Sequence, residues 1–220
     1  MKKAYITGAI ILLVMIGNSF AVYEHNPEAK YQKGLHYYKE KNYKKAAHLF
    51  KEAAKQGYAP AETKLGYMYL NGWGVPHDYK KAAYWLKKAA HQGDALGESY
   101  LGYMYDYGLG VPQDYSKAVY WYKKSAEQGN ANGEYNLGYS YQYGLGVPQN
   151  YGKAVYWYKK SAEQGDANGE NNLGTMYGEG LGVPQDYSKA VYWLKKAAEQ
   201  GNATAKANLE YLEEHLLGGY

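Results

Sequence analysis

Residues 108–121 read Gly-Leu-Gly-Val-Pro-Gln-Asp-Tyr-Ser-Lys-Ala-Val-Tyr-Trp, and the block recurs with small changes at 72–85, 144–157 and 180–193. Each copy ends on a tryptophan, and these tryptophans are 36 residues apart. Self-similarity at a fixed period of about 20–50 residues indicates stacked supersecondary units rather than one globular core. Arrays of this kind present extended binding surfaces. The repeat by itself therefore favours a binding scaffold.

One unit of the repeat carries the signals of two helices. Asp94 is expected to cap a helix over about 95–107, because its side chain can accept hydrogen bonds from the first free backbone N–H groups. Apolar residues then recur at helical spacing until a connector rich in glycine and proline interrupts them. Asp114 is expected to cap a second helix that runs to about residue 128, where a glycine ends it.

These units resemble Sel-one-like repeats, which are related to the tetratricopeptide repeat. The family pattern is a Leu-Gly-x-Met-Tyr helix, a Gly-x-Gly-Val connector and an Asp-x-x-Lys-Ala-x-x-Trp helix, and it appears here from Leu101 through Trp121. The match covers residues 60–201. The resemblance implies an all-α fold, a right-handed α-solenoid of stacked antiparallel helix pairs.

The expected organisation follows from this pattern and from its departures at both ends. The first unit lacks the Gly-Val-Pro connector and therefore resembles an ordinary tetratricopeptide repeat. The expected segments are a signal peptide at 1–21, a linker at 22–27, a tetratricopeptide-like first repeat at 28–57, Sel-one-like repeats at 60–93, 95–129, 131–165 and 167–201, and a C-terminal capping helix at 203–217.

The repeated tryptophans are expected to form the structural core between helix pairs. No single unit can bury its apolar face alone, so stability is expected from the interfaces between neighbouring units. On the second helix, Ala118, Trp121, Tyr122 and Ser125 share one face at spacings of three and four. The predicted core column is Trp85, Trp121, Trp157 and Trp193.

The N-terminus predicts export. Two lysines precede an apolar stretch over residues 4–16, and Ser19-Phe20-Ala21 offers the small residues of a cleavage site before Val22. The apolar stretch is shorter than the roughly 20 residues that span a membrane, although an uncleaved anchor is the alternative. We expect a periplasmic or secreted mature chain without a membrane span.

Composition excludes several classes of function. The chain contains no cysteine, which excludes a disulfide framework, a thiol nucleophile and a cysteine metal site. All of its basic residues other than histidine are lysines, so nucleic-acid recognition, which relies heavily on arginine, is disfavoured. The histidines do not recur in register, and the recurring acidic residues are explained as helix caps. We expect no metal, no cofactor and no enzymatic activity.

Tyrosine is the unusual residue, with 30 copies against two phenylalanines. Tyr103 lies two residues before Tyr105, about 200° around the helix, and is therefore expected to point away from the repeat core. In tetratricopeptide arrays the first helix lines the concave groove, so the resemblance implies a tyrosine ladder there. The alternative is a compositional bias without function. The candidate partner-binding residues of this tyrosine ladder are Tyr67, Tyr103, Tyr107, Tyr135, Tyr139 and Tyr143.

Together these observations predict an exported, non-enzymatic scaffold that binds a protein partner through its concave face. By resemblance, exported bacterial members of the family act as periplasmic or secreted adaptors. The alternative is glycan or peptidoglycan binding, with the tyrosine ladder as a stacking surface. Glycan binding predicts aromatic contacts interleaved with Asn and Asp, whereas protein binding predicts a mixed apolar and charged groove.

Overall fold

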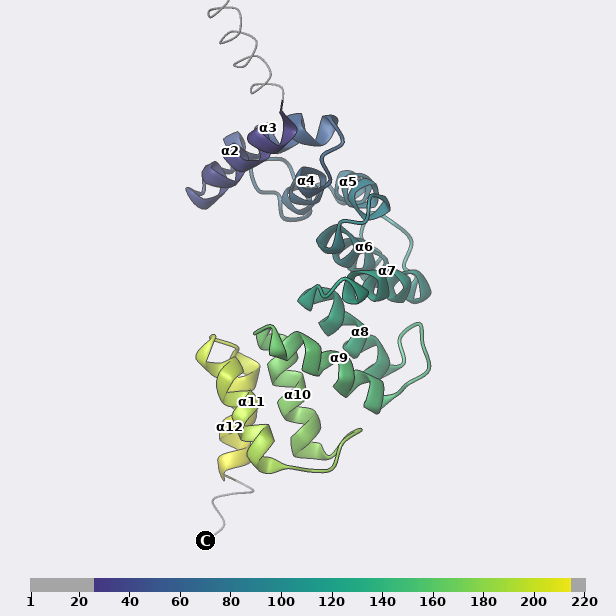
Figure 1. Ribbon diagram of the computed structural model, residues 1–220, viewed down its shortest axis with the longest axis vertical. Coiled ribbons are helices and arrows are strands. Elements are labelled where there is room, and N and C mark those ends of the chain that lie inside the picture. Colours follow the sequence, from purple (N-terminus) through teal and green to yellow (C-terminus); the bar gives the residue numbers. More distant parts are fainter. Residues whose placement is uncertain (1–25, 215–220) are drawn as a thin grey trace, which may run out of the picture. The chain divides into compact units, whose positions relative to one another are not determined.

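A computed structural model describes residues 26–214, in which all regular secondary structure is helical (Figure 1). This confirms the predicted all-α solenoid of stacked helix pairs. The predicted signal peptide lies outside the described residues. The helices are α2 (Pro27–Lys39), α3 (Tyr43–Lys55), α4 (Ala59–Asn71), α5 (Tyr79–His91), α6 (Ala95–Tyr107), α7 (Tyr115–Glu127), α8 (Ala131–Tyr143), α9 (Tyr151–Glu163), α10 (Ala167–Glu179), α11 (Tyr187–Glu199) and α12 (Ala203–Leu212).

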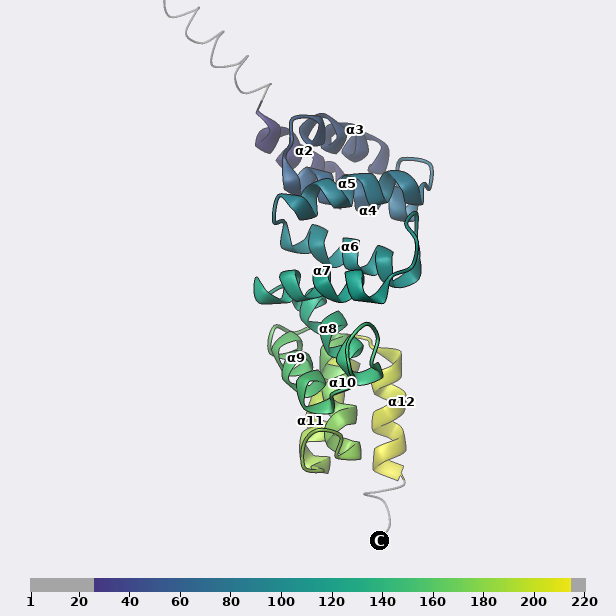
Figure 2. The ribbon, with the colours of Figure 1, turned by 90° about the vertical axis from the view of Figure 1, so that its right-hand side faces the viewer.

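The chain divides into two compact units, and the boundary falls within α5. The N-terminal unit ends at Ala89, and the C-terminal unit begins at Ala90. Within the C-terminal unit, α6 and α7 lie side by side as one helix pair (Figure 2). The pairs α8–α9 and α10–α11 repeat this arrangement, and α12 contacts α11.

Local chemistry sets the helix ends. The Asp94 carboxylate accepts a hydrogen bond from the backbone N–H of Gly97 at 2.7 Å, and Asp114 accepts one from Lys117 at 2.9 Å. Each satisfies a backbone donor that has no partner inside its helix. The first helix of the pair then ends at Gly108, whose φ of 68° is left-handed and favours glycine.

A glycine inside each first helix lets its partner helix come close. A Cβ atom added to Gly102 would lie 2.6 Å from the ring of Tyr122, and one added to Gly138 would lie 2.8 Å from the ring of Tyr158. Real Cβ atoms do not approach carbon atoms this closely. The rings of Tyr122 and Tyr158 therefore occupy the space that a side chain would fill.

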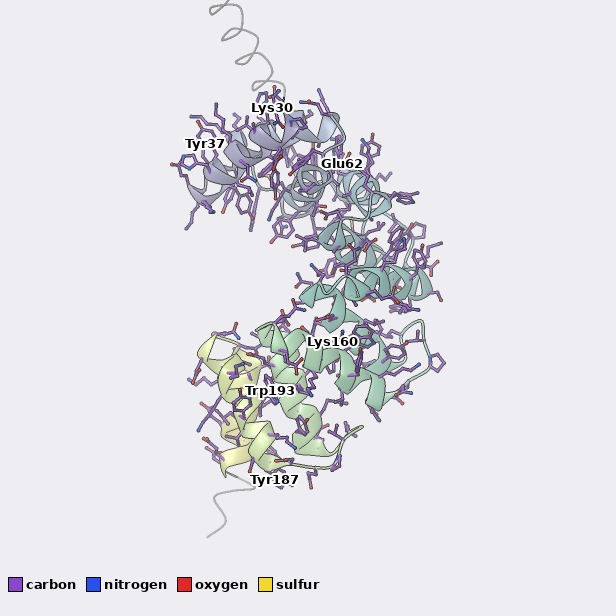
Figure 3. All side chains as sticks on the ribbon, viewed as in Figure 1. Lys30, Tyr37, Glu62, Lys160, Tyr187 and Trp193 are labelled. Atoms are coloured by element: carbon purple, nitrogen blue, oxygen red, sulfur yellow. The ribbon has the colours of Figure 1, made fainter. Side chains whose placement is uncertain are left out.

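The expected tryptophan core is displaced by one residue in the structure. Tyr122 and Tyr158 are fully buried, as are Leu86 and Leu194 at the same repeat position. Of the tryptophans one residue earlier, only Trp121 is buried, at 8% exposure. Trp85, Trp157 and Trp193 are half-buried; Trp193 is labelled on α11 in Figure 3.

The glycine inside each first helix explains why the residue after the tryptophan is the buried one. It opens space for the residue after each tryptophan, and one residue turns the side-chain direction by about 100°. The indoles of Trp157 and Trp193 consequently pack against the edge of the core clusters and keep one side towards solvent.

The last described helix covers the end of the array. Ala205 and Leu212 of α12 are buried, whereas Glu210, Glu213 and Glu214 are exposed. One face of α12 is therefore apolar and the other polar, as expected of a cap. Residues 215–217 of the predicted capping helix lie outside the described range.

Candidate binding surface

Five residues of the predicted tyrosine ladder lie together in the C-terminal unit, on α6 and α8. The ring centroids of Tyr103 and Tyr107 are 4.6 Å apart, and those of Tyr139 and Tyr143 are 4.5 Å apart. Tyr135 lies 6.4 Å from Tyr139. We call this set, Tyr103, Tyr107, Tyr135, Tyr139 and Tyr143, the tyrosine face.

The tyrosine face spans two neighbouring repeats. The helices α6 and α8 contact each other. Burial, the Asp106 carboxylate and then Tyr103 and Tyr139 raise the pKa of the Tyr107 hydroxyl, so a residue of α8 acts on one of α6. Burial and the neighbouring Tyr139 raise the pKa of Tyr135 to about 12. Burial and neighbouring negative charge both disfavour the ionised form of tyrosine.

Exposure divides the tyrosine face into two groups. Tyr107 is 59% exposed and Tyr143 is 54% exposed. Tyr103, Tyr135 and Tyr139 are half-buried and pack against the hydrophobic clusters around Tyr122 and Tyr158. The expectation that these side chains point away from the core is therefore correct only for the outer two. The rings of Tyr103, Tyr135 and Tyr139 each have one side covered by the core of a helix pair.

Hydrogen bonds from the core hold polar groups beside the tyrosine face. The Tyr122 hydroxyl donates to Asp106 Oδ2 at 3.1 Å, and the Tyr158 hydroxyl donates to Gln142 Oε1 at 2.6 Å. Burial raises the pKa of Asp106, and the hydrogen bond from Tyr122 partly opposes that shift. Each acceptor immediately precedes an exposed tyrosine, Tyr107 or Tyr143.

Tyr67, the remaining predicted residue, lies in the N-terminal unit. It is half-buried, and its ring meets Trp73 edge-on at 5.5 Å. Trp73 also stacks on Tyr43 at 5.1 Å with an interplanar angle of 20°. Tyr67 thus belongs to an aromatic cluster around Trp73.

The aromatic surface stops at α10. Thr175 and Glu179 occupy the repeat positions of Tyr139 and Tyr143. Asn208 Nδ2 donates to Asn171 Oδ1 at 3.1 Å and lies 3.4 Å from Thr175 Oγ1. Asn171, Thr175 and Asn208 form a polar group that we call the amide cluster.

A second tyrosine column, which sequence reasoning did not single out, lies on the second helices. Each of its members is exposed by 53–57% and meets the tryptophan that follows it edge-on at about 5 Å. Its members recur every 36 residues, and this recurrence could have identified them from the sequence. We call this set, Tyr84, Tyr120, Tyr156 and Tyr192, the outer tyrosine column.

Sequence reasoning also missed a column of buried glutamates. Glu62, labelled on α4 in Figure 3, is fully buried and lies 3.0 Å from the Lys88 ammonium. Glu98 accepts a hydrogen bond from Gln128 Nε2 at 2.7 Å, and burial raises its pKa although this bond opposes the shift. Glu134 and Glu170 repeat the contact with a glutamine at 2.7 Å. Because each glutamine caps the second helix of its own repeat, the column is structural.

The described residues offer no assembled metal centre. Among residues 26–214, no group of three or more His, Cys, Asp or Glu side chains could hold a metal ion. No helix in that range is long and apolar enough to cross a membrane.

Comparison with protein families assigns the repeats. The Sel1 repeat model matches residues 29–58, 59–94, 95–130, 131–166 and 167–202. The first of these matches includes the unit that we compared with an ordinary tetratricopeptide repeat. Among curated proteins, the comparison finds no relative that matches this chain.

Solved structures show the same architecture. A Sel1 repeat protein from Oxalobacter formigenes is 34% identical with a TM-score of 0.79, over 89% of this chain and 78% of that one. The c5321 protein, described as a protective antigen of uropathogenic Escherichia coli with an SLR fold, is 34% identical with a TM-score of 0.50. That match covers 91% of this chain and 52% of the antigen. A Sel1 repeat structure from Klebsiella pneumoniae is 22% identical with a TM-score of 0.61, over 86% and 94% of the two chains, and supports the fold alone.

Proposed function

The chain belongs to the Sel1 repeat family, and on that premise we propose that it is an exported scaffold that binds a protein partner through the tyrosine face. Repeat solenoids of this kind commonly serve as protein-interaction scaffolds. The observation that carries the proposal is the set of five tyrosines on the contacting helices α6 and α8, two of them more than half exposed.

The composition of this surface suits protein recognition. Tyrosine offers a large contact area with a polar tip and loses little rotamer freedom on binding. Serine, glycine and asparagine supply adaptable hydrogen bonds in other protein-binding surfaces. On α8, the partly exposed Asn136 lies between Tyr135 and Tyr139. The inner tyrosines are already held by the core, so little ordering is required when a partner binds.

Export is a separate part of the proposal and rests on the sequence of residues 1–21. Cleavage before Val22 would leave a mature chain that starts at that residue. Intact-mass measurement of the protein recovered from envelope and culture fractions should show the loss of residues 1–21. A full-length product held in the inner membrane would contradict export and leave the binding surface unaffected.

Glycan binding is the second candidate, and the amide cluster favours it. The partly exposed Asn208 places an amide group on α12, where it donates to the buried Asn171 of α10. Aromatic rings with neighbouring amides are the combination predicted for a sugar-binding surface. Titration with soluble peptidoglycan fragments tests this function: Asn208→Ala should weaken binding if glycan is the ligand and should leave binding of a protein partner unchanged.

The proposed protein binding is tested by affinity capture from envelope and culture fractions. The bait is the mature chain, and the comparison bait carries Tyr107→Ala and Tyr143→Ala. Both rings are more than half exposed, so the double variant should keep its helix content and its melting temperature. A partner that is retained by the wild type and lost by the double variant supports the proposal. A partner retained equally by both baits would place the binding site elsewhere.

A further inference from the structure

Lysine ammonium groups of the chain lie over many of its own aromatic rings. In the C-terminal unit, Lys124 Nζ lies 5.5 Å from the ring of Tyr120 and 5.4 Å from that of Trp121. The same cation–π arrangement recurs at Lys160 and Lys196 on the outer tyrosine column.

The first helices show the same arrangement on the side that meets the second helices. Lys117 Nζ lies 5.6 Å from the ring of Tyr105, and Lys153 Nζ lies 5.1 Å from that of Tyr141. Each of these tyrosines is two residues after a member of the tyrosine face, Tyr103 or Tyr139. Rings on the two sides of one helix therefore differ in their access to a cation.

The tyrosine face differs from the outer tyrosine column in this respect. Within the part of the chain that the structure describes, no lysine lies over the rings of its five residues. The sequences of α6, α8 and α10 contain no lysine, arginine or histidine at all. No cation on these helices can therefore reach the rings from the side.

The charges that do act on the tyrosine face are negative. The Asp106 carboxylate acts on Tyr107, and Glu179 acts on Tyr143. The faces of the rings themselves carry the negative part of the aromatic quadrupole. Rings and carboxylates thus attract positive charge at the same surface.

From this charge pattern we infer that the partner segment bound at the tyrosine face carries arginine or lysine side chains, which occupy the ring faces that the chain leaves uncovered. The inference rests on the proposed function and specifies the chemistry of the partner. Arginine suits the surface in two ways, because its planar guanidinium stacks on aromatic rings and pairs with carboxylates. An acidic segment would instead be repelled by the carboxylates of Asp106 and Glu179.

Synthetic peptides test this inference directly. The probes are three capped peptides of equal length that alternate Gly-Ser with three copies of arginine, of citrulline or of glutamate. Citrulline keeps the shape of arginine and removes its charge. Titration of the mature chain, followed by tyrosine ring signals in NMR, should show the arginine peptide binding at least about fivefold tighter than the citrulline peptide. Equal affinities for these two peptides would overturn the inference.

Variants locate the binding. Tyr107→Leu keeps apolar area but removes the ring, whereas Tyr107→Phe keeps the ring. The leucine variant should lose most of the preference for arginine over citrulline, and the phenylalanine variant should keep it. Tyr120→Leu, on the outer tyrosine column, is the matched control and should bind the arginine peptide like the wild type. If Tyr107→Leu also binds like the wild type, the peptide lies elsewhere and the inference is wrong.

The outcomes separate this inference from the proposed function. A captured protein that depends on Tyr107 and Tyr143, together with equal binding of the arginine and citrulline peptides, would keep the function and remove the inference. A peptide preference that depends on Tyr107, without any protein partner that depends on it, would support the surface chemistry and count against protein binding.

Discussion

The Tyr122 hydroxyl donates a hydrogen bond to Asp106 Oδ2 at 3.1 Å and so connects the fully buried core of a helix pair to the edge of the tyrosine face. In the next repeat, Tyr158 donates to Gln142, which is uncharged, at 2.6 Å. The same hydrogen bond from a buried tyrosine thus has a charged acceptor in one repeat and a neutral acceptor in the next.

This pair predicts different costs for removing the hydroxyl. Tyr122→Phe should lower the free energy of unfolding by about 1.5–3 kcal/mol, since its acceptor is a carboxylate. Tyr158→Phe should cost about 0.5–1.5 kcal/mol, the usual range for a neutral acceptor. Urea unfolding of the two variants measures both values. A larger loss for Tyr158→Phe would show that the charge of Asp106 adds nothing to its hydrogen bond.

The displaced core predicts that the tryptophans are not the most sensitive positions. Tyr158→Ala should cost about 3–5 kcal/mol because it empties a fully buried site. Trp157→Ala should cost less, since the indole is only half-buried and solvent can fill part of the space. Urea midpoints compare the two. A greater loss of unfolding free energy for Trp157→Ala would show that the tryptophans, and not the residues after them, form the core.

The intrahelical glycine predicts that a helix-favouring substitution destabilises. Gly102→Ala gains about 1 kcal/mol in helix propensity, but its Cβ would meet the Tyr122 ring at 2.6 Å. Overpacking of this kind costs about 1–3 kcal/mol, so we expect a net loss. Gly152→Ala is the control, because only Asn150 Oδ1 lies near its added Cβ, at 3.5 Å. Thermal melting should show Gly152→Ala to be neutral or stabilising; a stabilised Gly102→Ala would contradict the close approach.

The buried glutamates predict a pH dependence of stability. Burial raises the pKa of Glu98 and Glu134 above the ordinary value of 4.5, although their glutamine partners oppose the shift. The folded state therefore binds protons more readily than the unfolded state in the window just above pH 4.5. Stability from these groups rises as the pH falls through that window.

Two kinds of variant test this window. Glu98→Gln and Glu134→Gln together should reduce the rise in stability as the pH falls. Glu127→Gln, on the exposed surface, should leave this rise unchanged. The capping carboxylates act in the opposite direction: Asp114 and Asp186 have lowered pKa values, and their contribution is lost only below 3.8. An unchanged slope in the double glutamine variant, measured by urea unfolding at several pH values, would contradict the assignment.

The helices were predictable from the sequence because their signals are local. Asp94 and Gly108 bound the first helix of a repeat, and the predicted 95–107 agrees with α6. Asp114 likewise starts the second helix at the expected place. Capping and left-handed glycine depend only on residues within a few positions of each other.

The packing was not predictable in the same way. Whether Trp121 or Tyr122 enters the core depends on how closely α6 approaches α7 at Gly102, which is a contact between residues far apart in the chain. The half-burial of Tyr103 and Tyr139 has the same origin. The buried glutamates recur every 36 residues, but recurrence alone does not distinguish a buried carboxylate from an exposed one.

The most direct test of the central claim compares two double variants in binding to the captured partner. Tyr107→Ala with Tyr143→Ala removes the exposed rings of the tyrosine face, and Tyr120→Ala with Tyr156→Ala removes two equally exposed rings from the outer tyrosine column. Isothermal titration should show the first pair weakening binding by about 2–4 kcal/mol in total, within the range for interface aromatics. The second pair should change the affinity little. Loss of binding in the second pair with retention in the first would place the site on the second helices and contradict the account.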